Sequence, residues 1–145
     1  MSALRIVVYG RPAPQGSKSF MGLSKKTGRA ILAESSKAVK PWRELVWAAA
    51  VAVRHGPPLD EPIRVRMTFT LPKPASAPKR RKTWPMRVPD LSKLIRSTED
   101  ALTQAGIWVD DARVVECIAA KRYPNEGPDA LDSPGAVIEI EIIDG

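Results

Sequence analysis

The stretch that decides the fold spans residues 87–116 and reads RVPDLSKLIRSTEDALTQAGIWVDDARVVE. Its apolar positions recur every three or four residues, as on one face of a helix: Leu91, Leu94, Thr98 (through its methyl group), Ala101, Leu102 and Ala105. Gly106 follows where helices commonly end. The pattern predicts a helix over residues 91–105, with Asp90 before it and Asp110 and Asp111 after it.

These aspartates have two interpretations. An aspartate before a helix is an ordinary N-cap, and two aspartates after one are typical of a turn. Alternatively, a chain reversal after Gly106 brings Asp90 together with Asp110 and Asp111 around Mg²⁺. This ion prefers oxygen ligands and needs only one or two carboxylates. Spacing alone leaves both interpretations open.

Length and composition indicate one domain, residues 1–145. The single cysteine, Cys117, excludes an intramolecular disulfide and a cysteine-rich zinc site, and the lone His55 cannot build a histidine metal site. The N-terminal segment lacks an apolar run long enough for a signal peptide or a membrane span. We therefore expect a cytoplasmic protein with no membrane partner.

The net charge of +7 is unevenly distributed. Every charged residue between Pro62 and Pro89 is basic, and every charged residue after Arg122 is acidic. A basic surface of this kind binds nucleic acid, because lysine and arginine neutralise phosphates and release counterions. A merely solubilising surface explains the charge equally well, so composition suggests a nucleic-acid partner without naming a reaction.

The remaining elements are predicted from alternation, helical spacing and turn residues. We expect strands over residues 4–9, 63–71, 114–123 and 136–143, a hairpin over 22–32 turning at 26–28, and a helix over 38–54 capped by Ser36. Trp42 and Trp47 of that helix are expected in the core. Too few strands are separated by helices for a doubly wound sheet, so the fold class is α+β, with a mixed sheet of about four to six strands and two main helices.

Basic residues in four places predict contacts with a phosphate backbone. Residues 72–88 form a proline-rich loop without helical or strand periodicity, which we expect to be mobile until nucleic acid binds. Trp84 in this loop is a candidate for stacking on bases. The candidate DNA-binding residues in the first loop, the strand over 63–71, the basic loop and the helix are Lys18, Arg64, Arg66, Lys79, Arg80, Arg81, Lys82 and Lys93.

The central stretch resembles the RusA family of Holliday-junction resolvases, whose pattern is roughly P-D-L-D-N-L-x-K, then D-A-L, then G-x-W-x-D-D. The corresponding pieces here are residues 89–96 (PDLSKLIR), 100–102 (DAL) and 106–111 (GIWVDD). The detailed similarity covers about a fifth of the chain. It implies a small α+β homodimer that cuts four-way DNA junctions by paired nicks with Mg²⁺.

The resemblance also implies residue roles. Asp90 and Asp111 stand at the positions of catalytic, metal-binding aspartates, and Asp110 is an acidic neighbour that completes the implied metal set. Arg96 stands where the family usually has a catalytic lysine. It keeps the charge for contact with a phosphate but cannot donate a proton as lysine does.

Ser92 departs from the family pattern, which has a metal-binding aspartate there, and Lys93 replaces an asparagine. In one account, Asp90, Asp110 and Asp111 hold the metal and water fills the gap. In a second, Glu99 or Asp100 supplies a carboxylate, although seven residues of helix rise about 10 Å from Ser92 to Glu99. In a third, the protein binds junctions but cuts them poorly.

The favoured hypothesis is therefore a Mg²⁺-dependent, structure-selective endodeoxyribonuclease. A non-catalytic branched-DNA-binding dimer is the alternative that the Ser92 departure supports. A weaker third hypothesis is an RNA-binding protein in which the aspartates only cap and turn the chain.

Overall fold

The computed structural model describes residues 3–16, 18–23, 30–34 and 37–144, with residues 18–23 and 30–34 described as backbone only. In chain order the elements are β1 (Ala3–Tyr9), β2 (Lys18–Leu23), β3 (Ala30–Glu34), α1 (Val39–Val53), β4 (Ile63–Thr70), α2 (Leu91–Gln104), the 3₁₀ turn η1 (Asp111–Arg113), β5 (Val114–Arg122) and β6 (Gly135–Ile142). Strands β2 and β3 form an antiparallel hairpin with its own two-stranded sheet. The predicted hairpin is confirmed, while its turn at 26–28 lies outside the described residues.

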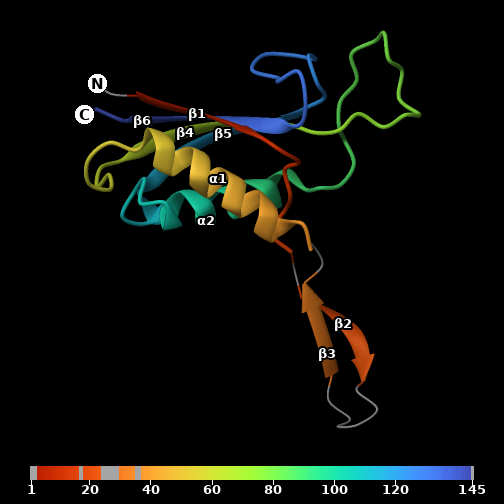
Figure 1. Ribbon diagram of the computed structural model, residues 1–145, viewed down its shortest axis with the longest axis horizontal. Helices are drawn as coiled ribbons and strands as arrows, with labels where there is room; N and C mark the ends of the chain where they lie inside the picture. The colour runs from red at the N-terminus through yellow and green to blue at the C-terminus, as the bar shows by residue number, and fades with distance from the viewer. Residues whose placement is uncertain (1–2, 17, 24–29, 35–36, 145) are drawn as a thin grey trace.

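The other four strands form one mixed sheet in the order β1-β6-β4-β5. Strand β6 is antiparallel to both β1 and β4, whereas β4 and β5 are parallel. Parallel neighbours need a crossover connection, and α2 lies in the connection between these two strands. Figure 1 shows α1 and α2 side by side on one face of the sheet. The predicted α+β class, with a small mixed sheet and two main helices, is confirmed.

The core lies between the sheet and the two helices. Alternate residues of β4 point into it, and Ile63, Val65, Met67 and Phe69 are fully buried there. Their partners in β6 continue the same apolar layer, since Met67 pairs with the buried Ile138. The clean two-residue alternation of β4 therefore fixes which face of the sheet the helices cover.

Helix α1 buries one apolar stripe and is joined to α2 by a buried hydrogen bond. Trp42 is 1% exposed, and its indole Nε1 donates to Thr98 Oγ1 at 3.2 Å. The core prediction is confirmed for Trp42 and wrong for Trp47, which is 46% exposed because it lies on the opposite side of the helix. Ala38 occupies the N-cap position, and the predicted cap, Ser36, lies outside the described residues.

The end of α2 is set by Gly106, whose φ of +77° is a left-handed conformation that glycine adopts without strain. Beyond it the Ile107 amide donates to the Leu102 carbonyl at 3.1 Å, and the Trp108 indole donates to Thr103 Oγ1 at 2.7 Å. The chain thus reverses against the last turn of α2.

Gly106→Ala is expected to destabilise the fold more than Gly56→Ala, the matched control. Both glycines have a positive φ, which costs another residue about 1 kcal/mol. Only at Gly106 does an added Cβ approach a neighbour, 2.5 Å from Arg54 Nη1. Displacing Arg54 also removes its 3.0 Å hydrogen bond to the Ala105 carbonyl, worth about 1 kcal/mol. Urea unfolding measures both variants, and equal losses would contradict the assigned role of Arg54.

Candidate functional site

Asp90 occupies the N-cap position of α2 without acting as a side-chain cap. Its backbone carbonyl accepts from the Lys93 and Leu94 amides at 3.1 Å, but its carboxylate accepts no capping hydrogen bond. The carboxylate is 55% exposed and lies 3.7 Å from Lys93 Nζ. The ordinary interpretation of Asp90 as a cap that satisfies helix amides is therefore wrong, and the carboxylate faces solvent at the helix start.

The segment before Asp90 is anchored to the far end of β5. Lys121 points to the helix side of the sheet, and its Nζ donates to the backbone carbonyls of Arg87 and Pro89, both at 2.9 Å. Sequence reasoning missed this role. The sequence does contain a signal for this role, because Lys121 is a charged residue at a strand position that faces the helices, paired with the buried Phe69 of β4. Lys121 places Asp90 near the C-terminal end of β5.

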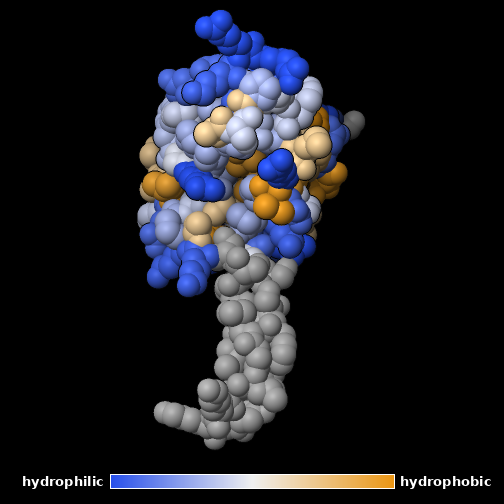
Figure 2. Space-filling view, turned by 90° about the vertical axis from the view of Figure 1, so that its right-hand side faces the viewer, coloured by the Kyte–Doolittle hydropathy of each residue, from blue (hydrophilic) through white to orange (hydrophobic). Residues whose placement is uncertain are grey.

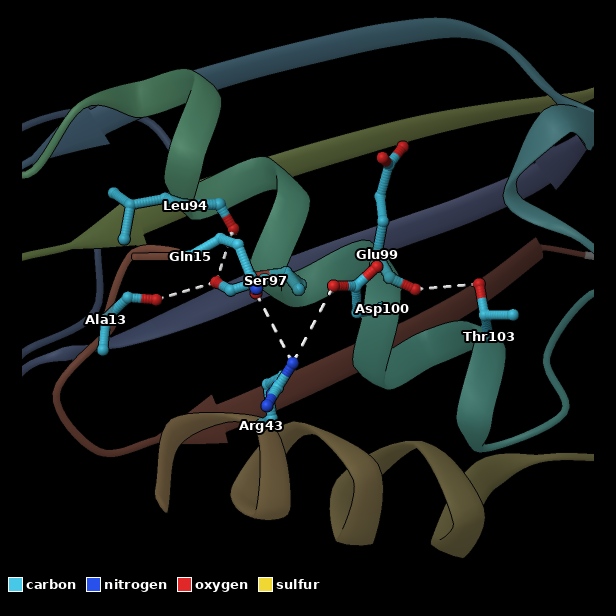
Figure 3. A network of polar contacts seen from close by, with 9 residues as sticks. Ala13, Gln15, Arg43, Leu94, Ser97, Glu99, Asp100 and Thr103 are labelled. Atoms are coloured by element: carbon cyan, nitrogen blue, oxygen red, sulfur yellow. Dashed lines mark hydrogen bonds and ion pairs between the residues drawn. The ribbon is translucent and has the colours of Figure 1, made fainter. Parts of the chain in front are cut away.

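The loop after β1 packs on the same part of α2. The backbone amide of Gln15 donates to the Lys93 carbonyl at 2.9 Å. The buried Ser97 hydroxyl donates to the Ala13 carbonyl at 2.7 Å (Figure 3). A cavity of about 500 Å³ opens between this loop and Asp90, with Arg11 and Lys93 as its basic lining. The cavity gives the Asp90 end of α2 a concave, partly basic surface.

Asp110 and Asp111 lie together past the other end of α2. Asp110 accepts from the Ala112 amide at 2.7 Å, and this hydrogen bond is the main reason that the pKa of Asp110 is lowered. The pKa of Asp111 is raised, first by its hydrogen bond with Asp110, and then by partial desolvation and by the negative charges of Asp110 and Asp100. The turn interpretation is thus correct for Asp110. At Asp111 the surroundings disfavour the charged form of the carboxyl group.

Two acidic residues of α2 extend this group, which we call the acidic end (Glu99, Asp100, Asp110 and Asp111). Burial, followed by the charges of Asp111 and Asp100, raises the pKa of Glu99. Figure 3 shows Asp100 directed toward Arg43 of α1, at 3.9 Å, and Glu99 directed away from α1. Burial raises the pKa of Cys117 on β5, and the charge of Glu99 raises it further.

Helix α2 separates Asp90 from the acidic end. Its 14 residues rise about 20 Å. The reversal at Gly106 returns Asp110 and Asp111 to the C-terminal end of the helix and does not carry them to Asp90. Within the described part of the chain, no three acidic, histidine or cysteine side chains gather closely enough to hold a metal ion. The expected meeting of Asp90 with Asp111 therefore does not occur within one chain.

The acidic end nevertheless has donors of the kind that Mg²⁺ takes. Two carboxylates suffice when water and substrate oxygens complete the coordination, and Asp110 and Asp111 provide them. Burial is the main reason that the pKa of Glu99 is raised, and the hydrogen bond with Asp110 is the main reason at Asp111. Neighbouring negative charges raise both pKa values further, and a bound cation would relieve that part. Asp110 and Asp111 thus fit the ion, and Asp90 is the predicted ligand that lies elsewhere.

The other predicted site residues are placed as follows. Ser92 and Arg96 are exposed four residues apart, on one face of α2 between Asp90 and the acidic end.

Arg64 lies on the opposite face of the sheet from the helices. It donates to Glu116 at 2.6 Å and to Glu141 at 2.5 Å, and these hydrogen bonds raise the pKa of Arg64. Arg66 shares that face, so DNA contacts by these two arginines remain predictions on a surface remote from Asp90. The side chain of Lys18 lies outside the described part of the structure.

The basic loop, residues 72–88, leaves the C-terminal end of β4. Residues 79–82 are exposed in it, and Figure 2 shows hydrophilic residues gathered at the top of this side of the molecule. The loop has no helix or strand, as predicted, but Glu126 fastens it, through an ion pair with Lys73 and a 2.8 Å hydrogen bond from the Thr83 amide. Trp84 is 57% exposed, with Lys82 Nζ 4.4 Å from its ring centroid.

Comparison with models of known families matches residues 10–141 to the family described as Endodeoxyribonuclease RusA. The match covers most of the chain, including both ends of α2 and the whole basic loop. A search of curated proteins found no match. No helix in the described part of the chain combines the length and apolar character needed to cross a membrane.

Asp111→Asn is expected to stabilise the metal-free protein at pH 7.5, because asparagine removes a repelled charge and still donates a hydrogen bond to Asp110. The gain is about 0.5 kcal/mol or less, since solvent screens these carboxylates. It shrinks as the pH falls through the raised pKa of Asp111 and is gone below the ordinary value near 4, where residue 111 is neutral in both proteins.

Urea unfolding in EDTA at several pH values measures this difference, with Asp132→Asn as a control carboxylate in an exposed loop. A destabilised Asp111→Asn variant at pH 7.5 would show that the aspartate is there for structure.

Proposed function

The chain belongs to the RusA endodeoxyribonuclease family, and from that premise we propose that it is a Mg²⁺-dependent nuclease that resolves four-way (Holliday) or branched DNA junctions by paired nicks. The observation that most supports the catalytic proposal is the carboxylate of Asp90, which stands at the N-cap position but accepts no capping hydrogen bond. A structural aspartate at this position normally bonds the first-turn amides. A homodimer and a cytoplasmic location belong to the same proposal.

The proposed metal ligands are Asp90, Asp110 and Asp111, with Asp90 contributed by the other copy of the homodimer. When bound, Mg²⁺ lowers the pKa of its water and stabilises the leaving oxygen of the phosphodiester. Asp110 is held in place by the Ala112 amide, and the anchored segment before Asp90 fixes the start of α2. Arg96, exposed between the two acidic positions, is proposed to contact the scissile phosphate.

The basic loop is proposed to hold the DNA. Its exposed residues 79–82 and the neighbouring Lys93 neutralise phosphates without reading bases. Arg64 and Arg66, with Lys18, complete the proposed DNA contacts. The charge of Arg64 is already balanced by Glu116 and Glu141, so we expect it to contribute less than any residue of the loop.

Ser92 bears on whether the protein cuts DNA at all. It is exposed in the first turn of α2, where a hydroxyl replaces the family's carboxylate. Glu99 and Asp100 belong to the acidic end, so neither can take its place beside Asp90 in the same chain. We favour a site in which water fills this position. A non-catalytic junction-binding dimer is the second candidate, supported by the missing carboxylate at Ser92.

Nicking of a synthetic four-way junction separates the two candidates. The wild-type protein is expected to nick in Mg²⁺ and not in EDTA. Asp111→Asn is expected to lower the rate at least 100-fold, while Asp132→Asn, an exposed carboxylate outside the site, leaves it unchanged. Metal-independent nicking, or an active Asp111→Asn variant, would remove the proposed mechanism. Tight junction binding without any nicking would favour the second candidate.

Replacing Lys79, Arg80, Arg81 and Lys82 together with alanine is expected to weaken binding to all DNA sequences alike. The slope of log K against log salt should fall by about 0.9 for each phosphate contact removed. Fluorescence anisotropy over a range of salt concentrations measures this slope. Arg64→Ala is the paired comparison and should change it by less than one contact, whereas an unchanged slope for the loop variant would place the DNA elsewhere.

A further inference from the structure

Three cavities adjoin one another at the end of the molecule where α2 begins. The cavity of about 500 Å³ beside Asp90 and a second cavity of about 240 Å³ share the lining residues Arg11, Pro12, Val88 and Pro89. The second cavity and a third, of about 490 Å³, share Pro74, Arg87 and Tyr123. Trp84 of the basic loop lines the third. The three cavities therefore form one groove from Asp90 to Trp84, which we call the loop groove.

The loop groove is basic along its length. Its basic lining residues are Arg11, Arg81, Lys82, Arg87 and Lys93. Arg11 and Arg87 are exposed, and within the described ranges neither is paired with a carboxylate. Their charges are available to neutralise phosphates, whereas the charge of Arg64 is already balanced. A DNA strand that leaves Asp90 along the groove therefore meets further cations.

Apolar side chains are exposed at the loop end of the groove. Trp84 is 57% exposed, Met86 90% and Val88 85%. Figure 2 shows exposed apolar residues beside hydrophilic ones on this side of the molecule. Contacts with phosphates require charge rather than apolar area, so this surface indicates a second kind of ligand group. Nucleobases fit that description, because their flat faces stack on aromatic rings.

The Trp84 ring is held from the protein side and accessible to a ligand. The Arg122 guanidinium lies 5.0 Å from the ring centroid and donates to the Lys121 carbonyl at 3.3 Å. Arg122 packs so closely on Gly127 that an added Cβ there would lie 2.8 Å from Arg122 Nε. The other cation on the ring, Lys82, lies 4.4 Å from the centroid and is exposed. A base can therefore take the place of Lys82 on the ring while Arg122 stays fixed.

Hydrogen bonds hold the loop in this shape without DNA. Lys73 forms an ion pair with Glu126 and donates to the Arg81 carbonyl at 3.2 Å. Lys121 donates to the Arg87 carbonyl at the other end of the loop. The loop groove is thus formed before a ligand binds, which lowers the ordering cost of binding.

Trp84 can stack only on a base that is not stacked within a duplex, because paired bases have both faces covered by their neighbours. We propose that the loop groove binds an unpaired stretch of a DNA strand between the cut site at Asp90 and Trp84. The preferred substrate is then branched DNA with a single-stranded arm or gap beside the branch point. This inference rests on the proposed function for the position of the cut, while binding of an unpaired strand stands on the groove itself.

Binding in EDTA tests the groove without any cleavage. Fluorescence anisotropy compares a duplex that has a single-stranded overhang of about four nucleotides, a short site for a single-strand binder, with a blunt duplex of equal phosphate number. The wild-type protein is expected to bind the overhang duplex about 10-fold more tightly, as one stacked base provides. Trp84→Ala should abolish this preference without changing binding to the blunt duplex, and Trp84→Phe should retain most of it.

Trp47→Ala, which removes an exposed tryptophan of α1 outside the groove, is the matched control and should keep the full preference. A 2-aminopurine base in the overhang reports stacking directly. Its fluorescence should be quenched on binding to the wild-type protein and to Trp47→Ala, but not on binding to Trp84→Ala.

The path of the strand is tested at Arg11 and Arg87, which lie between the two ends of the groove. For the overhang duplex, Arg11→Ala and Arg87→Ala should each lower the slope of log K against log salt by about 0.7, the value for one contact with a single strand. Arg5→Ala, an exposed arginine of β1 outside the groove, is the control and should leave the slope unchanged.

An absent overhang preference in the wild-type protein, or a preference that Trp84→Ala leaves intact, would overturn the groove. An RNA overhang bound more tightly than the DNA overhang would overturn the assignment to a DNA strand. If the protein prefers the overhang but nicks no branched DNA in Mg²⁺, the proposed function fails while the single-strand groove stands. If it nicks junctions but shows no overhang preference, the groove fails while the nuclease proposal stands.

Discussion

The length of α2 is the constraint on which the rest of this structure depends. A helix is a rigid spacer, and its 14 residues, which rise about 20 Å, keep Asp90 apart from the acidic end. The crossover from β4 to β5 requires this helix, because two parallel neighbours cannot be joined by a short turn. The topology that builds the sheet therefore also divides the acidic residues, and a site that uses all of them has to be completed from outside the chain.

The acidic end is poorly arranged for stability. After burial at Glu99 and the hydrogen bond with Asp110 at Asp111, repulsion between the carboxylates also raises the pKa values of these two residues. Stronger interactions hold these carboxylates in place. The Trp108 indole donates a hydrogen bond to Thr103, and the buried core beneath α2 fixes the position of the helix. Perturbed carboxylates of this kind are concentrated at functional sites, where a bound ion offsets their repulsion.

Much of the fold could be predicted from local patterns. The spacing from Leu91 to Ala105 and the glycine after it determined α2, and the alternation in residues 63–70 determined β4 and its buried face. The sequence could not show which strands pair, because pairing depends on contacts between distant residues. For that reason Lys121 was missed. Trp47 was placed wrongly in the core because the side of α1 on which it lies was not distinguished from that of Trp42. At the site, the sequence identified the aspartates and the N-cap position of Asp90, but not the direction of its carboxylate or its distance from Asp111.

The measurement that tests this account most directly is a crystal structure of the wild-type protein soaked in Mn²⁺, with the ion located by anomalous scattering. The account predicts an ion contacted by Asp90 of one copy and the partner subunit's Asp111. An ion held by Asp110 and Asp111 of a single chain, with every Asp90 remote from it, would contradict the account.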